Sequence, residues 1–161
     1  MPGTTPLTDR IEIAELFARL ARLLDEGRYE DVRSVYAEDV VVHSPLGGEL
    51  HGIDEVLAFL RGSRVEGEHT QHLHGDVLVK VSGDQAEASA NQLVHRYRTG
   101  EPPHRESGLR LAYTAVRTPA GWRFREGRLT LAWARGDGGR LPPVHQVDSG
   151  TISSVDTQDG L

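Results

Sequence analysis

The chain has 161 residues and a mass of 17.7 kDa, the size of one ordinary domain, and 37% of its residues are hydrophobic, enough for a core without cross-links. It contains no cysteine, which excludes disulfides, thiolate nucleophiles and cysteine-ligated zinc. A formal net charge of −6 argues against nucleic acid as a partner. Because no stretch has the length and apolarity of a membrane span or a secretory leader, we expect a soluble, cytoplasmic protein with no membrane partner.

The first predicted element is a helix from about Asp9 to Glu26. Thr8 or Asp9 can cap it, and Asp9 with Glu12 has the spacing of a capping box. Apolar residues recur at helical spacing and predict the buried stripe, namely Ile13, Leu16, Phe17, Leu20 and Leu24.

A row of small residues, Ala14, Ala18 and Ala21, runs beside this stripe and ends at Asp25. Alanines favour close packing of a helix on a sheet, so the row predicts that Asp25 points along a packed flank.

The next segment predicts a short helix over 29–39, then a strand ending near Ser44 and a return strand near Leu50. "IDEVLAFLRG" predicts a third helix, with Ile53, Val56, Leu57 and Leu60 on its apolar side. From His69 onward the pattern predicts four strands joined by tight turns, over 69–82, 85–99, 106–118 and 121–134. Helices followed by an antiparallel meander indicate the α+β class.

The predicted organisation is one domain over 8–135 between two less structured ends. Residues 1–7 are expected to be a flexible N-terminus. Residues 136–161 are rich in glycine, serine and aspartate, and we expect a tail that is either disordered or folded over a pocket or a partner.

The stretch "HTQHLHGD" (69–76) concentrates three of the eight histidines. His72 and His74 alternate onto one strand face and could both reach one metal ion. A His-x-His metal site of the cupin type needs a following glutamate, and only Asp76 follows here. We therefore predict neither a metal nor another cofactor.

A histidine can instead act as a general base when a buried carboxylate fixes its tautomer. Asp25 is the carboxylate of the helical region that the pattern places on a packed flank. The residues alone leave several partners for it open: His43, His72, His74 and His95.

The order of motifs resembles the nuclear transport factor 2-like superfamily, and within it the SnoaL-like and scytalone dehydratase-like branch. The resemblance covers about residues 8–135 and depends on "LARLLDEGRYEDVRSVYAEDVVVHSPLGG", "HGIDEVLAFL", "TQHLHGDVLVKVSGDQAEA" and "GWRF". It implies a cone-shaped α+β roll, in which helices pack on a curved, mostly antiparallel sheet that encloses a pocket.

The resemblance also implies a catalytic dyad. In scytalone dehydratase, the bile-acid dehydratases and the hexachlorocyclohexane dehydrochlorinase, an aspartate ends the first helix and a histidine begins the strand after the third helix. These positions match Asp25 in "LLDEG" and His72 in "TQHLHG". The histidine would remove a proton while the aspartate orients it, which implies a β-elimination or a related proton transfer.

Departures from the family indicate a different substrate. Ser44 stands where ketosteroid isomerases keep a catalytic aspartate, and Leu24 replaces the pocket tyrosine beside the dyad aspartate. Leu109 and Leu111 fall near a serine and an asparagine of scytalone dehydratase, and His95 falls near its second pocket histidine. The implied pocket is more apolar on one wall.

The expected function is that of a cofactor-independent lyase or isomerase, by dehydratase-like elimination or cyclisation, on a small apolar carbonyl metabolite of the kind found in secondary metabolism. A binding module without chemistry and a polyketide cyclase remain alternatives. We expect a homodimer or homotrimer. The predicted catalytic residues are His72, Asp25 and His95, and the predicted substrate-binding residues are His43, Ser44, His74, Tyr97, Leu109, Leu111 and Tyr113.

Overall fold

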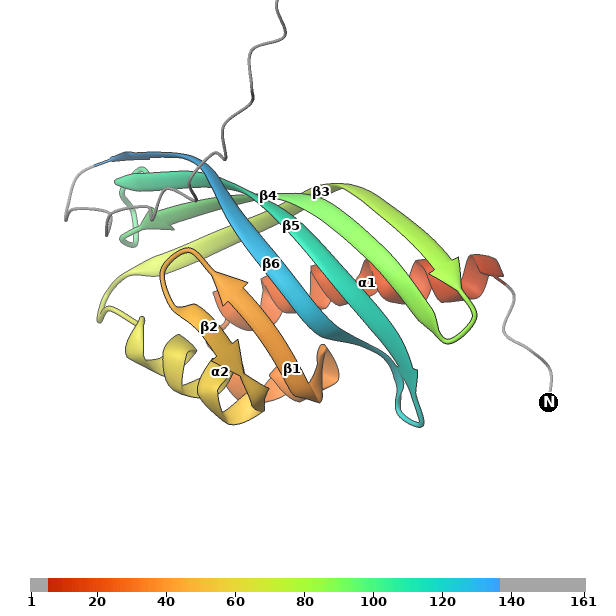
Figure 1. Ribbon diagram of the computed structural model, residues 1–161. Coiled ribbons are helices and arrows are strands. Elements are labelled where there is room, and N and C mark those ends of the chain that lie inside the picture. The colour runs from red at the N-terminus through yellow and green to blue at the C-terminus, as the bar shows by residue number, and fades with distance from the viewer. Residues whose placement is uncertain (1–5, 137–161) are drawn as a thin grey trace, which may run out of the picture.

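A six-stranded sheet curves over a long N-terminal helix in the computed structural model, which describes residues 6–136 (Figure 1). The elements in chain order are α1 (Pro6–Asp25), the 3-10 helix η1 (Tyr29–Ser34), β1 (Tyr36–Ser44), β2 (Gly48–His51), α2 (Gly52–Gly62), β3 (His69–Ser82), β4 (Gln85–Tyr97), β5 (Arg105–Thr118) and β6 (Gly121–Gly136). The predicted tail, apart from its first residue, lies outside the described residues.

The strands stand in the order β2-β1-β6-β5-β4-β3. Strands β3 to β6 form the predicted antiparallel meander, and β2 returns antiparallel to β1. The pairing of β1 with β6 is parallel and joins the two parts into one sheet. The α+β class and the helix-covered, mostly antiparallel sheet are confirmed. Helix α2 lies beside β1 and β2 at one end of this sheet (Figure 1).

Helix α1 begins at Pro6, before the predicted start, so Asp9 lies within the helix and not at its first residue. Asp9 is buried inside the helix and accepts hydrogen bonds from the Arg117 guanidinium and from Trp122 Nε1. Glu12 accepts the backbone N–H of Trp122. Asp9 and Glu12, which were predicted to form a capping box, therefore bind α1 to the β5–β6 hairpin. Buried residues of α1 that pack in the core are Ile13, Leu16, Phe17, Leu20 and Leu23.

Two other predictions about the helices need correction. The second helix is only the 3-10 helix η1, and β1 begins at Tyr36, because the β-branched and aromatic run that follows packs as a strand. In the small-residue row, Ala18 is exposed and only Ala21 is buried. The row does not form a continuous packed flank, although Asp25 at its end is only partly exposed.

Strand register decides which side chains enter the space between the sheet and the helices. His72 pairs with Val94, and Val94 pairs with Ser107, so these three form one inward row. A bulge in β3 lies after Gly75, where Asp76 has a φ of 52°. Because the bulge follows His74, this side chain keeps the phase of His72 and also points inward.

The opposite face of the sheet carries exposed apolar side chains, among them Leu73, Leu93 and Trp133. Leu73 pairs with Leu93, Leu93 pairs with Gly108, and Gly108 pairs with Trp133, so the row crosses strands β3 to β6. The indole of Trp133 lies over Gly108. The predicted homo-oligomer stays a prediction. Between residues 6 and 136 no helix is both long and apolar enough to cross a membrane.

Candidate active site

Asp25, the last residue of α1, holds His72 at the start of β3 through both the ring and the backbone. Its Oδ1 lies 2.6 Å from His72 Nδ1, and its two oxygens lie 3.1 and 2.9 Å from the backbone nitrogen of His72. Thr70 donates a further hydrogen bond to Oδ1 at 3.1 Å. The side chains of His72 and Asp25 are 13% and 23% exposed, so the pair is mostly shielded from bulk water.

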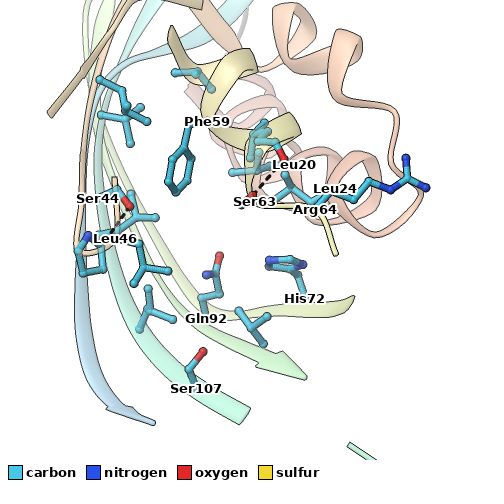
Figure 2. A pocket seen from close by; sticks show the side chains of 18 of the residues that line it. Leu20, Leu24, Ser44, Leu46, Phe59, Ser63, Arg64, His72, Gln92 and Ser107 are labelled. Carbon is cyan, nitrogen blue, oxygen red and sulfur yellow. Dashed lines mark hydrogen bonds between the residues drawn. The ribbon is translucent and has the colours of Figure 1, made fainter. Parts of the chain in front are cut away.

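This arrangement sets the hydrogen positions on the His72 ring. A carboxylate only accepts hydrogen bonds, so Nδ1 carries the hydrogen that Asp25 receives. In the neutral ring Nε2 is then a bare lone pair, and it has no hydrogen-bond partner among residues 6–136. His72 projects into a cavity (Figure 2), which makes Nε2 available to a ligand there.

The cavity has a volume of about 220 Å³ and lies between the end of α1, β1, β2, α2 and the inward face of β4 to β6. Most of its wall is apolar. The apolar lining includes Leu20, Leu24, Val42, Leu46, Leu50, Val56, Phe59, Leu60, Val94, Leu109, Leu129 and Leu131. Figure 2 shows His72, Gln92 and Ser107 on the sheet side, across the cavity from Phe59.

Charged residues gather at one end of the cavity. Arg96 on β4 pairs with Arg105 on β5, and both point inward like His72, in the row next to the one that contains His72. Glu68 lines the cavity beside these two arginines. Glu68 accepts hydrogen bonds from Arg96 at 3.0 Å and from His104 at 2.9 Å. Burial raises the pKa of Glu68, but the hydrogen bonds from His104 and Arg96 outweigh burial and lower the pKa below its ordinary value. Arg105 has no ion-pair partner within residues 6–136.

Two buried tyrosines, Tyr36 and Tyr113, line the cavity. The hydroxyls of Tyr36 and Tyr113 lie 3.1 Å apart. Burial raises the pKa of Tyr36 to about 12 and that of Tyr113 well above its ordinary value, so both hydroxyls keep their hydrogens. Only one of them can donate to the other, which leaves the second O–H for another acceptor. The ring of Tyr113 stacks on Phe124 and lies over Gly127, where a Cβ would stand 2.2 Å from it.

His74 and Gln92 form a second polar pair beside the dyad. His74 Nδ1 lies 2.8 Å from the carbonyl oxygen of Phe17, and Nε2 lies 2.7 Å from Gln92 Oε1. Burial lowers the pKa of His74, and this outweighs the hydrogen bonds to Gln92 and Phe17, which raise it. Among residues 6–136 no three histidine, aspartate or glutamate side chains gather as a metal site.

The predicted site residues divide into three groups: those that line the cavity or contact a residue that does, those that point inward without lining it, and those on the other face of the sheet. His72, Ser44, Leu109 and Tyr113 line the cavity, and Asp25 contacts it through His72. His74 points inward, but it lies between Phe17 and Gln92 and does not line the cavity. Leu111 is buried in the hydrophobic core and does not line the cavity either.

Three predicted residues lie on the other side of the sheet. His95 contacts Glu106 at 3.0 Å, His43 contacts Glu49 and Glu126, and the ring of Tyr97 packs on His69. The prediction that they face the cavity is corrected by strand alternation: Val42 and Val94 point inward, so their neighbours His43 and His95 point outward.

Four polar or charged cavity residues were not predicted from the sequence, namely Gln92, Ser107, Arg96 and Arg105. One pattern in β4 could have identified Gln92. Every second residue of β4 is apolar and buried, namely Ala86, Ala88, Ala90 and Val94. Gln92 lies at the same spacing, so this alternation places it on the inward face of β4.

Comparisons with known proteins agree with this architecture. An NTF2-like protein with a cystatin-like fold from Novosphingobium aromaticivorans is 32% identical and has a TM-score of 0.66, with 78% of this chain and 83% of that one covered. A candidate scytalone dehydratase from the same organism is 20% identical, with a TM-score of 0.72 and coverage of 83% and 91%. A type 2 hexachlorocyclohexane dehydrochlorinase is 16% identical, with a TM-score of 0.72 and coverage of 85% and 95%.

Among curated protein sequences no match was found. The family model of the SnoaL-like domain matches residues 5–128, which include Asp25, His72 and most of the cavity wall. Helices packed on one face of a six-stranded sheet, the cavity beneath that sheet and this match together show that the chain belongs to the SnoaL-like family of the NTF2-like fold.

Proposed function

We propose that this protein is a cofactor-independent lyase or isomerase that removes a proton from a carbon next to a carbonyl group of a small, largely apolar metabolite. The observation that carries the proposal is the contact of 2.6 Å between Asp25 and His72 at the wall of an apolar cavity. The contact leaves His72 Nε2 as a lone pair aimed at whatever occupies the cavity.

The chemistry follows from the roles of the two side chains. His72 Nε2 takes the proton from carbon, and the electron pair of the broken C–H bond moves into an enolate. The imidazolium that forms is stabilised by the carboxylate of Asp25. In an elimination, the enolate expels a β-hydroxyl group and His72 returns its proton to that group, which leaves as water. In an isomerisation or an aldol-type cyclisation, the same enolate is protonated at another carbon or attacks a second carbonyl.

Hydroxyl groups in the cavity supply candidates to stabilise the enolate oxygen. Ser107 lies in the same inward row as His72, and Ser44 lines the opposite wall. The Tyr36 and Tyr113 pair, which also lines the cavity, offers one further O–H. Fixed donors in a mostly apolar space stabilise a developing negative charge more than water does. His95 cannot take this role, because it lies on the other face of the sheet.

The size of the cavity supports a ring compound as substrate. An apolar cavity of about 150 Å³ accommodates benzene, and this one has about 220 Å³. The bicyclic ketone 3-hydroxy-1-tetralone is a suitable probe, because loss of water from it gives 1-naphthol, which is detected by its absorbance. 1-Tetralone has no leaving group, so exchange of its α-hydrogens in D₂O reports proton transfer alone.

The test compares the wild type with His72→Gln in both assays. A positioned general base typically contributes about 10²- to 10⁴-fold in rate, and we expect His72→Gln to lose activity by that factor. The matched control is His69→Gln, on the outer face of the same strand, which should retain full activity. If the wild type binds 1-tetralone yet neither exchanges nor dehydrates the probes above the buffer rate, the protein is a binding module and the proposal is wrong.

A further inference from the structure

The two ring nitrogens of His74 face two oxygen atoms, and this determines what Gln92 presents to the cavity. The carbonyl oxygen of Phe17 can only accept, so His74 Nδ1 carries a hydrogen and donates it across 2.8 Å. A neutral imidazole has one N–H, which leaves Nε2 as an acceptor. The amide of Gln92, 2.7 Å from Nε2, must then donate to it.

The surroundings of His74 favour the neutral ring. It stands edge-on to the ring of Phe17, with centroids 5.8 Å apart, at the buried side of β3. The charged or titratable groups that act on it are His72, which disfavours a positive charge, and Asp25, which favours one but is already held by His72 and Thr70. Burial is the largest influence on its pKa and lowers it.

In the structure Gln92 Oε1 faces His74, so a neutral His74 ring requires the opposite amide orientation, with Gln92 Nε2 toward His74 and Oε1 toward the cavity. A half-turn about the last side-chain torsion exchanges these two atoms, and the hydrogen-bond network decides between the two orientations. The half of the amide that does not contact His74 has no hydrogen-bond partner within residues 6–136. No unpartnered buried side-chain oxygen or nitrogen occurs in that range, so this half is accessible from the cavity that Gln92 lines.

We propose that Gln92 positions the substrate by accepting a hydrogen bond from one of its hydroxyl groups, so that the cavity selects hydroxylated ring compounds over their ethers. Gln92 lies in the inward row next to that of His72, and Figure 2 shows both side chains projecting into the same space. This assignment rests on the proposed function, because it takes the cavity beside His72 as the substrate site. His74 acts through Gln92 by holding the amide in one orientation.

Binding of two matched probe pairs tests the proposal without any turnover. The pairs are 1-naphthol with 1-methoxynaphthalene and 2-naphthol with 2-methoxynaphthalene, measured by calorimetry. Each ether keeps an acceptor oxygen but cannot donate. We expect at least one naphthol to bind the wild type about tenfold more tightly than its ether, the size of one hydrogen bond. In Gln92→Met, which keeps the length of the side chain, the ratio should fall several-fold.

The same ratio in Gln92→Met as in the wild type would overturn the proposal, and so would equal binding of naphthol and ether by the wild type. If the methionine variant does not fold, Gln92→Asn replaces it, because its amide is one methylene shorter and cannot reach from His74 to the ligand.

Long-range proton–nitrogen correlation spectra of the wild type supply an independent readout. His74 should be the tautomer with hydrogen on Nδ1 only, and a hydrogen on Nε2 would contradict the amide orientation. Failure here is distinguishable from failure of the proposed function. Absence of tetralone turnover by a wild type that prefers a naphthol to its ether would refute only the proposed function, whereas equal binding of naphthol and ether by a wild type that turns over the tetralones would refute only the role of Gln92.

Discussion

The carboxylate of Asp25 contacts His72 at three points, with one oxygen 2.6 Å from the ring nitrogen Nδ1 and both oxygens within 3.1 Å of the backbone nitrogen. The backbone contacts tie the start of β3 to the end of α1, and the ring contact sets the tautomer of His72. One side chain thus joins the packing of the helix on the sheet to the chemistry of the cavity.

Replacing Asp25 with asparagine should abolish most of the proposed activity while leaving the fold intact. Asparagine keeps an acceptor for the backbone, but it carries no charge and its NH₂ group can donate to Nδ1, which would move the ring hydrogen to Nε2 and remove the base. We expect a loss of about 10²- to 10⁴-fold in the exchange of 1-tetralone hydrogens. The matched control is Asp31→Asn, whose ion pair with Arg28 is exposed on η1. Equal rates for the two variants would refute the role of Asp25.

The two tryptophans of the chain should differ sharply in their contribution to stability. Trp122 is fully buried and donates to Asp9 at 3.0 Å, whereas Trp133 is 47% exposed on the outer face. Trp122→Phe removes a hydrogen bond to a carboxylate and leaves a small void, at a cost of about 2–4 kcal/mol in the free energy of unfolding. Trp133→Phe should change it by about 0.5 kcal/mol or less. Urea unfolding followed by circular dichroism measures the free energy of unfolding of both variants. Similar decreases in the two variants would show that the contact of Trp122 with Asp9 does not stabilise the packing of α1 on the β5–β6 hairpin.

Stability should fall as the pH drops below the ordinary pKa of histidine, because of His74. Burial lowers its pKa in the folded protein from 6.5, so below about pH 6.5 the unfolded chain takes up a proton that the folded protein does not. The free energy of unfolding then decreases as the pH falls, with a slope of at most about 1.4 kcal/mol per pH unit for this one proton. The contribution is complete above pH 6.5 and is lost as the pH falls through the lowered folded pKa.

Urea unfolding at pH 7.5 and 5.5 measures this dependence, and His74→Gln should reduce it. Glu68 and Glu106 do not contribute between pH 5.5 and 7.5. Their pKa values in the folded protein are lowered from the ordinary value of 4.5, so they change stability only near and below pH 4.5. An unchanged pH dependence in His74→Gln would show that His74 is not the neutral, buried group that the orientation of Gln92 requires.

Local patterns in the sequence were enough to predict most of the elements. Helical spacing predicted α1 and α2, and alternation with tight turns predicted the four strands from His69 onward, because these features depend on neighbours in the chain. The placement of Asp25 beside His72 was also predicted, from the family resemblance rather than from spacing alone.

Which strand face is inward was decided by tertiary structure. His95 was expected in the cavity, but the register with β3 turns it outward and turns Gln92 inward. On β6, Leu129 and Leu131 line the cavity, and continued alternation would bring Trp133 to the same face. A register shift opposite Gly108 turns Trp133 outward instead. A change of one residue in register exchanges the two faces of a strand, and pairing between distant segments sets that register.

The sequence by itself thus determined the kinds of elements, their order and the residue types available for proton transfer, because these follow from short-range periodicity and composition. Only the tertiary structure decided which polar groups share the cavity with His72. Gln92, Ser107 and Arg96 reach that cavity through the pairing of β3, β4 and β5, and their roles depend on contacts with residues far away in the chain.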